Sequence, residues 1–89
     1  MKKLDKKDFV KATVSVRLTP GQMLKTLREL QEFSQKDLSN ITGISQSNIS
    51  ALESGSKLIG RERALVLARA LKVHPAVILF PDFDINEVA

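Results

Sequence analysis

The N-terminal part of the chain shows a strict alternation of apolar and polar side chains. Every second position of this stretch is apolar: Val10, Ala12, Val14, Val16 and Leu18. The positions between them are charged or carry a hydroxyl group: Lys11, Thr13, Ser15 and Arg17. A period of two with β-branched residues predicts a β-strand with one buried face. It is the one strand pattern that we find in the sequence.

From Thr19 onward the apolar residues recur every three or four positions, which is typical of amphipathic helices. Thr19 suits an N-cap and Pro20 suits the first helical position. The apolar positions that follow, and that we expect to face inward, are Met23, Leu24, Leu27 and Leu30, with Phe33 near the helix end. The sequence therefore predicts a first helix directly after the strand.

Capping signals then bound two short helices. Ser34 and Ser45 are placed as N-caps, and Gly43 and Gly55 are placed to end the two helices, because glycine tolerates positive φ. Their expected inward positions are Leu38, Ile41, Ile49 and Leu52. Only residues 43–45 separate the two helices.

Two more helices are predicted after a loop. The fourth runs from about Arg61 to Lys72, with inward positions at Ala64, Leu65, Ala68 and Leu71. A short fifth helix covers residues 74–80, with Pro75 near its start. His74 is the single histidine, so we interpret it as a junction residue rather than a metal ligand or a general base.

The stretch SQKDLSNITGISQSNISALESG, residues 34–55, has the pattern of a helix-turn-helix. Burial of Leu38, Ile44, Ile49 and Leu52 would leave the start of its second helix exposed and free to enter a DNA major groove. The segment QSNISALES contains no lysine or arginine, although the chain has 14 of them. Base edges are neutral donors and acceptors that Gln, Asn and Ser can bond, whereas cations suit the phosphates beside the groove.

Charge is distributed unevenly, in agreement with this division. Residues 1–36 carry a net charge of +5, residues 37–56 carry −2, residues 57–72 carry +4 and residues 73–89 carry −3. The helix without basic residues is thus flanked by basic segments, and the tail is acidic. A basic balance indicates a polyanionic partner.

Composition limits the alternatives. The chain has 89 residues, 43% of them hydrophobic, and no cysteine, so we expect one small globular domain in a reducing compartment. No apolar run approaches a membrane span, and Asp5 and Asp8 interrupt the basic N-terminus, which argues against a signal peptide. We therefore expect a cytoplasmic protein. No nucleophile–base pair, metal-ligand set or phosphate-binding glycine loop is present, so we expect neither an enzyme nor a bound metal or cofactor.

Residues 34–55, together with LARALKVHPAVILF behind them, resemble the Xre/Cro/repressor-type helix-turn-helix DNA-binding family. The resemblance covers roughly residues 21–80. It implies an all-α, five-helix, lambda-repressor-like fold, here with one N-terminal β-strand. Ser39 and Thr42 depart from the family pattern, which prefers alanine and an aliphatic residue there, but both are small enough to fit.

The resemblance also implies roles for individual residues. The residues expected at base edges are Gln46, Ser47, Ser50 and Ala51. The residues expected along the phosphate backbone are Gln35, Asn48, Ser54, Ser56 and Lys57. Arg28 and Glu53 match a buried ion pair that ties the first helix to the reading helix.

The flanking segments VRLTPGQMLKTLREL and RALVLARALKVHPAVILFPDF resemble small antitoxins of the HigA type. That resemblance implies an autorepressor that also binds a RelE-like ribonuclease toxin. A stand-alone or phage-type regulator is the alternative, and a helix-turn-helix that binds only protein is a second one.

The sequence divides into three parts: an arm and strand at residues 1–18, the helix-turn-helix domain at residues 19–81, and an acidic tail at residues 82–89. A single strand leaves both of its edges unpaired. We therefore expect the apolar face from Val10 to Leu18 to pair with the same strand of a second chain, giving a homodimer that suits a palindromic operator. Pairing with a toxin's sheet is the alternative.

Overall fold

The computed structural model describes residues 18–82, and these residues form helices without any strand. The helices are α2 (Pro20–Leu30), α3 (Gln35–Thr42), α4 (Gln46–Ser54), α5 (Arg61–Leu71) and α6 (Pro75–Leu79). The predicted all-α architecture is confirmed for this part of the chain. The predicted strand lies outside it except for Leu18, which belongs to no helix or strand.

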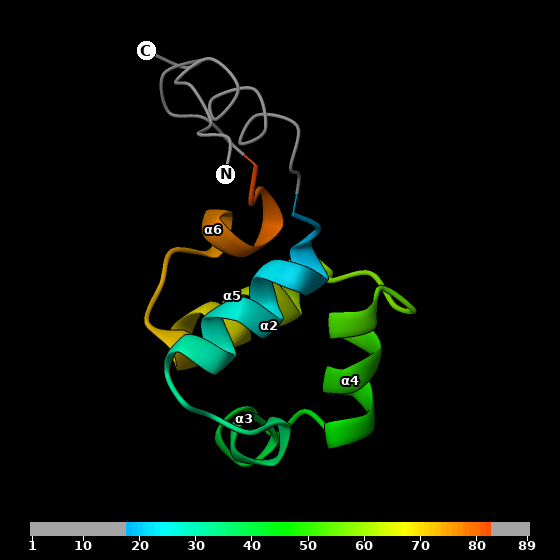
Figure 1. The fold of residues 1–89 in the computed structure, drawn as a ribbon, viewed down its shortest axis with the longest axis vertical. Coiled ribbons are helices and arrows are strands. Elements are labelled where there is room, and N and C mark those ends of the chain that lie inside the picture. The colour runs from blue at the N-terminus through cyan, green and yellow to red at the C-terminus, as the bar shows by residue number, and fades with distance from the viewer. Residues whose placement is uncertain (1–17, 83–89) are drawn as a thin grey trace, which may run out of the picture.

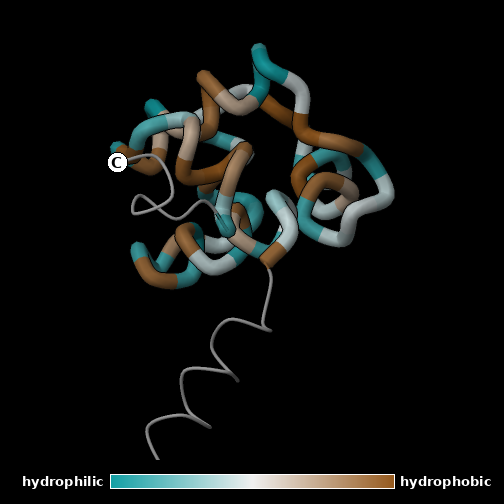
Figure 2. The backbone as a smooth tube through the Cα atoms, turned by 90° about the horizontal axis from the view of Figure 1, so that it is seen from above, coloured by the Kyte–Doolittle hydropathy of each residue, from teal (hydrophilic) through white to brown (hydrophobic). Residues whose placement is uncertain are grey.

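The helices surround one small core. Helix α2 packs against α4 and α6, and α5 packs against α3 and α6, with α3 and α6 at opposite ends of the bundle (Figure 1). Hydrophobic and hydrophilic residues are mixed along each helix, as amphipathic packing requires (Figure 2). The buried cluster consists of Leu24, Leu38, Ile49, Leu52, Leu67, Ala68, Leu71 and Ile78.

Side-chain caps begin α2, α3 and α4 at Thr19, Ser34 and Ser45, as the sequence predicts. The Thr19 hydroxyl accepts a hydrogen bond from the Gln22 backbone N–H at 3.1 Å, and the Gln22 side-chain oxygen accepts one in return from the Thr19 N–H at 2.9 Å. Ser34 and Asp37 form the same reciprocal arrangement at the start of α3. Imidazole Nδ1 of His74 accepts from the Ala76 N–H at 3.0 Å, so this residue caps α6.

Three expected inward positions are wrong. Leu30, Ile41 and Leu65 expose 75%, 53% and 47% of their surface. In α5 the buried side is set by Ala64, Ala68 and Leu71, and Leu67 lies on that side. Leu65 is one residue beyond Ala64, which turns it about 100° away from the core.

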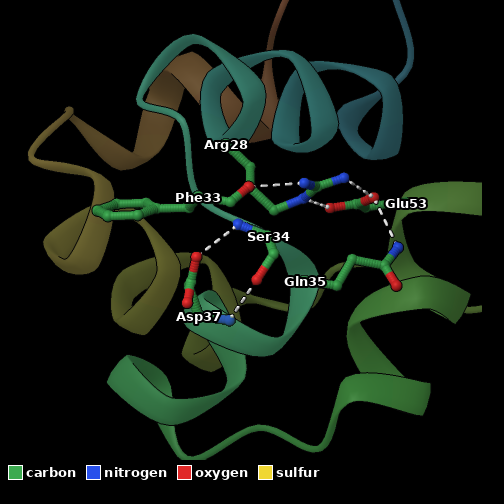
Figure 3. Close-up of polar contacts among 6 residues, drawn as sticks. All are labelled: Arg28, Phe33, Ser34, Gln35, Asp37 and Glu53. Atoms are coloured by element: carbon green, nitrogen blue, oxygen red, sulfur yellow. Dashed lines mark hydrogen bonds and ion pairs between the residues drawn. The ribbon is translucent and has the colours of Figure 1, made fainter.

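In α2 the inward stripe contains a charged residue. Arg28 lies one turn beyond Leu24, and its side chain is only 10% exposed. Its Nε donates to Glu53 Oε2 at 2.7 Å and its Nη2 to Glu53 Oε1 at 3.0 Å (Figure 3). The third nitrogen, Nη1, donates to the Phe33 carbonyl at 2.8 Å, which ties the α2–α3 connection to the same group. Arg28 and Glu53 therefore link three successive elements of the domain.

Helices α2 and α4 approach each other closely at Gly21. A Cβ atom at this position would lie 2.7 Å from the Glu53 carbonyl oxygen and closer still to that of Leu52. Both neighbours are backbone atoms near the end of α4, so neither can move alone. The contact explains why a buried glycine occupies the first turn of a helix.

We expect Gly21→Ala to lower the free energy of unfolding by about 1–3 kcal/mol, because the added methyl group would push the two helices apart. Alanine is the better helix former by about 1 kcal/mol, so the packing argument and intrinsic helix propensity predict opposite signs. Chemical denaturation measures the difference. Gly60→Ala is the matched control, since nothing lies within 4 Å of that position. An unchanged or raised stability for Gly21→Ala would contradict the close approach.

We expect Glu53→Ala to lower the free energy of unfolding by about 3–5 kcal/mol, because it leaves the buried Arg28 guanidinium without its carboxylate. Thermal or chemical denaturation measures the change. Glu62→Ala removes an exposed carboxylate from the first turn of α5 and should cost no more than about 1 kcal/mol. If both variants unfold like the wild type, the ion pair does not support the fold.

Candidate nucleic-acid interface

Helices α3 and α4 are joined by a turn of three residues, 43–45. Gly43 ends α3 with φ of 79°, a left-handed conformation that glycine adopts without steric cost. The Ser45 hydroxyl then accepts from the Asn48 N–H at 3.2 Å and starts α4. Buried Leu38 and Ile49 pack the two helices together, which leaves the outer face of α4 exposed.

The four residues expected at base edges lie on this outer face. Gln46, Ser47 and Ser50 are exposed, and Ala51 is half-buried. The hydroxyl oxygens of Ser47 and Ser45 lie 3.3 Å apart, which brings both groups to the exposed start of the helix. The surface therefore offers amide, hydroxyl and methyl groups and no charge.

Three of the residues expected along the phosphate backbone, Ser54, Ser56 and Lys57, lie at or just beyond the C-terminal end of α4. Lys57 Nζ donates to Asn48 Oδ1 at 2.6 Å, which connects the following loop back to the helix. The Lys57 backbone N–H also bonds to the Ala51 carbonyl at 3.1 Å, and the Ser54 and Ser56 hydroxyl oxygens lie 3.0 Å apart. These contacts hold a cation and two hydroxyl groups at the edge of the exposed face.

Gln35 lies apart from this group, at the first position of α3. Its side-chain Nε2 donates to Glu53 Oε1 at 3.0 Å, so the amide is oriented by the same carboxylate that pairs with Arg28 (Figure 3). Sequence reasoning missed this contact. The hydrogen bond from Arg28 to Glu53 also raises the pKa of Arg28, which keeps its charge secure.

A polar cleft of about 310 Å³ opens where α2, α3 and α4 meet. Its lining residues are Lys25, Arg28, Gln35, Ser50, Glu53 and Ser54. Glu53 is neutralised by Arg28, so Lys25 leaves the cleft with a net positive charge. Sequence reasoning did not single out Lys25, although its spacing of three residues from Arg28 places both on neighbouring positions of α2.

Asp37 is the acidic residue in the first turn of α3, two positions after Gln35. The hydrogen bond from the Ser34 backbone N–H lowers the pKa of Asp37, so the carboxylate stays ionised. The negative charge of Asp37 stabilises α3, because it lies at the N-terminal, positive end of the helix dipole.

Among the described residues, no cluster of three or more His, Cys, Asp or Glu side chains could hold a metal ion. Within residues 18–82, no helix is both long enough and apolar enough to cross a membrane. The described surface that carries the predicted site residues is a polar helix face, with the cations Lys25 and Lys57 at its margins.

Two similar solved structures are the restriction-modification controller protein C.AhdI from Aeromonas hydrophila and the P22 c2 repressor in complex with synthetic operator 9T in the presence of Tl⁺. C.AhdI is 30% identical, with a TM-score of 0.64, and the match covers 67% of this chain and 91% of that chain. The repressor is 25% identical, with a TM-score of 0.68 and coverages of 72% and 97%. No curated protein sequence gives a significant match.

The profile of the helix-turn-helix family matches residues 24–78. This range contains α3, the turn and α4, and most of the packing that supports them. The match spans more than half of the 89 residues. The chain therefore belongs to the helix-turn-helix family.

Proposed function

We propose that this protein is a sequence-specific DNA-binding transcriptional regulator that places α4 in the major groove of duplex DNA. The observation that carries the proposal is the outer face of α4, where exposed amide and hydroxyl groups stand on a helix with no free charge. Its single charged residue, Glu53, is paired inward with Arg28. A helix of this width fits the major groove of B-form DNA.

The chemistry of the exposed residues suits base recognition. Glutamine can bond the N6 and N7 positions of adenine with both atoms of its amide, and serine can bond several base edges. The methyl group of Ala51 can contact a thymine methyl group. We assign Gln46, Ser47 and Ser50 to hydrogen bonding and Ala51 to the apolar contact.

The surrounding residues suit the DNA backbone. Phosphate contacts fix the position of a protein on DNA without reading sequence. We assign this role to Gln35, Asn48, Ser54, Ser56 and Lys57, and add Lys25 because it lines the cleft beside Gln35. Two similar structures support the assignment: one is a repressor solved with an operator, and the other is a controller protein.

We further propose that the regulator binds a palindromic operator as a homodimer. Two copies of α4 related by a two-fold axis match two half-sites about one DNA turn apart. The sequence predicts the dimer contact at residues 10–18, which lie outside the described structure except for Leu18. Sedimentation of the full chain and of a form that starts at residue 18 compares their dimer affinities. Equal affinities would exclude this segment as a dimer contact.

The finer proposal is that the regulator is the antitoxin of a toxin–antitoxin pair and represses its own operon. It is supported by the resemblance of both flanks to HigA-type antitoxins. Co-expression with the product of the adjacent reading frame tests it. A stable complex with a small RelE-like ribonuclease, and relief of its toxicity, is expected; growth arrest that this protein does not relieve would leave a stand-alone regulator.

We expect Gln46→Ala to weaken operator binding by about 1–3 kcal/mol, because adenine would lose its amide partner. Binding to scrambled DNA should stay nearly unchanged. The operator is first selected from a random duplex library, and electrophoretic shifts then measure both affinities. Asn40→Ala, which removes an exposed amide from α3, is the control. Equal losses on operator and scrambled DNA would show that Gln46 does not read bases.

We expect Lys57→Gln to weaken binding to operator and scrambled DNA alike, because a phosphate contact carries no sequence information. The slope of log K against log salt should become shallower by about 1. A salt titration of both affinities measures this. Arg61→Gln removes the same charge from the exposed start of α5, which none of the assigned DNA or dimer contacts uses, and should leave the slope as in the wild type. A selective loss on the operator would instead place Lys57 at a base.

A further inference from the structure

A second surface of the domain, which shares no lining residue with the outer face of α4, has the character of a binding groove. It lies between the end of α3 and the second half of α5 and encloses about 460 Å³. Its lining residues, which define the α3–α5 groove, are Ile41, Thr42, Val66, Arg69, Ala70 and Lys72. Nothing in the proposed DNA contact uses this groove.

The groove combines exposed apolar side chains with positive charge. Ile41 and Val66 expose 53% and 42% of their surface. Arg69 and Lys72 contribute two cations, and none of the described residues that line the groove is acidic. An acidic segment with interspersed apolar side chains would satisfy both features at once.

The conformation of Lys72 is an independent observation. This residue ends α5 with φ of 59°, in the left-handed region. Glycine adopts this conformation more readily and is the usual residue at such a position. The lysine thus adds a cation to the groove at a conformational cost, which is common at functional sites.

The chain itself contains a segment with the required chemistry. Residues 83–89 read FDINEVA, with Asp84 and Glu87 among the apolar residues Phe83, Ile85 and Val88. The side chains of residues 83–89 carry a net charge of −2, with no lysine or arginine among them. Charge and hydropathy of the segment are therefore complementary to those of the groove.

A two-fold axis can bring residues 83–89 of one copy to the groove of a second copy. The described chain ends at Asp82 beyond α6, which lies at the opposite end of the bundle from α3 (Figure 1). Seven extended residues reach at most about 25 Å. In a two-fold symmetric dimer, the segment of each copy can bind the groove of the other copy, so the two contacts are equivalent.

We infer that residues 83–89 of one copy bind the α3–α5 groove of a second copy, so that two reciprocal contacts join a homodimer. This contact is additional to the predicted pairing of residues 10–18 and does not depend on DNA binding. In each contact Asp84 and Glu87 meet Arg69 and Lys72, while the apolar residues of the segment cover Ile41 and Val66.

Charge exchange between two variants of the full chain tests the inference. Arg69→Glu with Lys72→Glu changes the charge of the groove from positive to negative. Asp84→Lys with Glu87→Lys changes the charge of the segment from negative to positive. Each variant alone should raise the dimer dissociation constant by about tenfold or more, since like charges would face each other. An equimolar mixture should form a heterodimer of wild-type affinity, because both reciprocal contacts again join opposite charges. Dilution series in sedimentation velocity experiments measure all three constants.

Two further variants separate this effect from folding and from net charge. Lys72→Gly should raise the dissociation constant while the melting temperature stays equal to or above that of the wild type, because glycine suits the left-handed position. Lys36→Glu with Arg61→Glu makes the same charge change outside the groove and should leave dimer affinity as in the wild type. A mixture that binds no more tightly than its separate components, or a control as weak as the groove variant, would overturn the inference.

Discussion

The ion pair between Arg28 and Glu53 determines where the exposed face of α4 lies relative to the rest of the domain. Arg28 stands on the inward side of α2, and Glu53 stands near the end of α4. Three guanidinium nitrogens are used, two on the carboxylate and one on the Phe33 carbonyl, so the angle between the helices and the entry into α3 are fixed together. A hydrophobic pair could fill the same space, but it could not satisfy a backbone carbonyl or orient the amide of Gln35.

This arrangement removes the one charge of α4 from its outer face. A carboxylate exposed near DNA would be repelled by phosphates, whereas Glu53 is neutralised inside the protein. Two cations, Lys25 and Lys57, lie beside the helix rather than on it. Packing and electrostatics thus impose the same division: neutral hydrogen-bonding groups in the centre of the surface and positive charge at its margins.

Local chemistry explains why the helix boundaries could be predicted from the sequence. Capping side chains and positive-φ glycines act on their own neighbours, and Thr19, Ser34, Ser45, Gly43 and Gly55 all occupy the ends that they were expected to occupy. Which residues the inward faces contact depends on tertiary packing, and the helical period alone does not predict it. Leu65 and Leu67 both lie next to the stripe of Ala64, Ala68 and Leu71 on the helical wheel, and only the packing of α5 against its neighbours shows that Leu67 is buried and Leu65 is not. The packing role of Gly21 could not be predicted from its neighbours in the sequence, because it depends on the α4 backbone 31 residues away. The base and phosphate assignments remain predictions, since their partners are not part of the chain.

Short helices of 8 and 9 residues, such as α3 and α4, are marginal in isolation. Their stability must come from the inner side: Leu38 and Ile49 in the core, Leu52 beneath α2, and Glu53 in the ion pair. The outer positions of α4, by contrast, contribute little to packing. Because the two sets of residues alternate along one helix, Gln46, Ser47 and Ser50 can change without loss of the fold. A domain of this design can therefore acquire a new DNA sequence preference through substitutions that leave its folding energy almost unaffected, which is a physical reason why one small helix-turn-helix scaffold can serve many different operators.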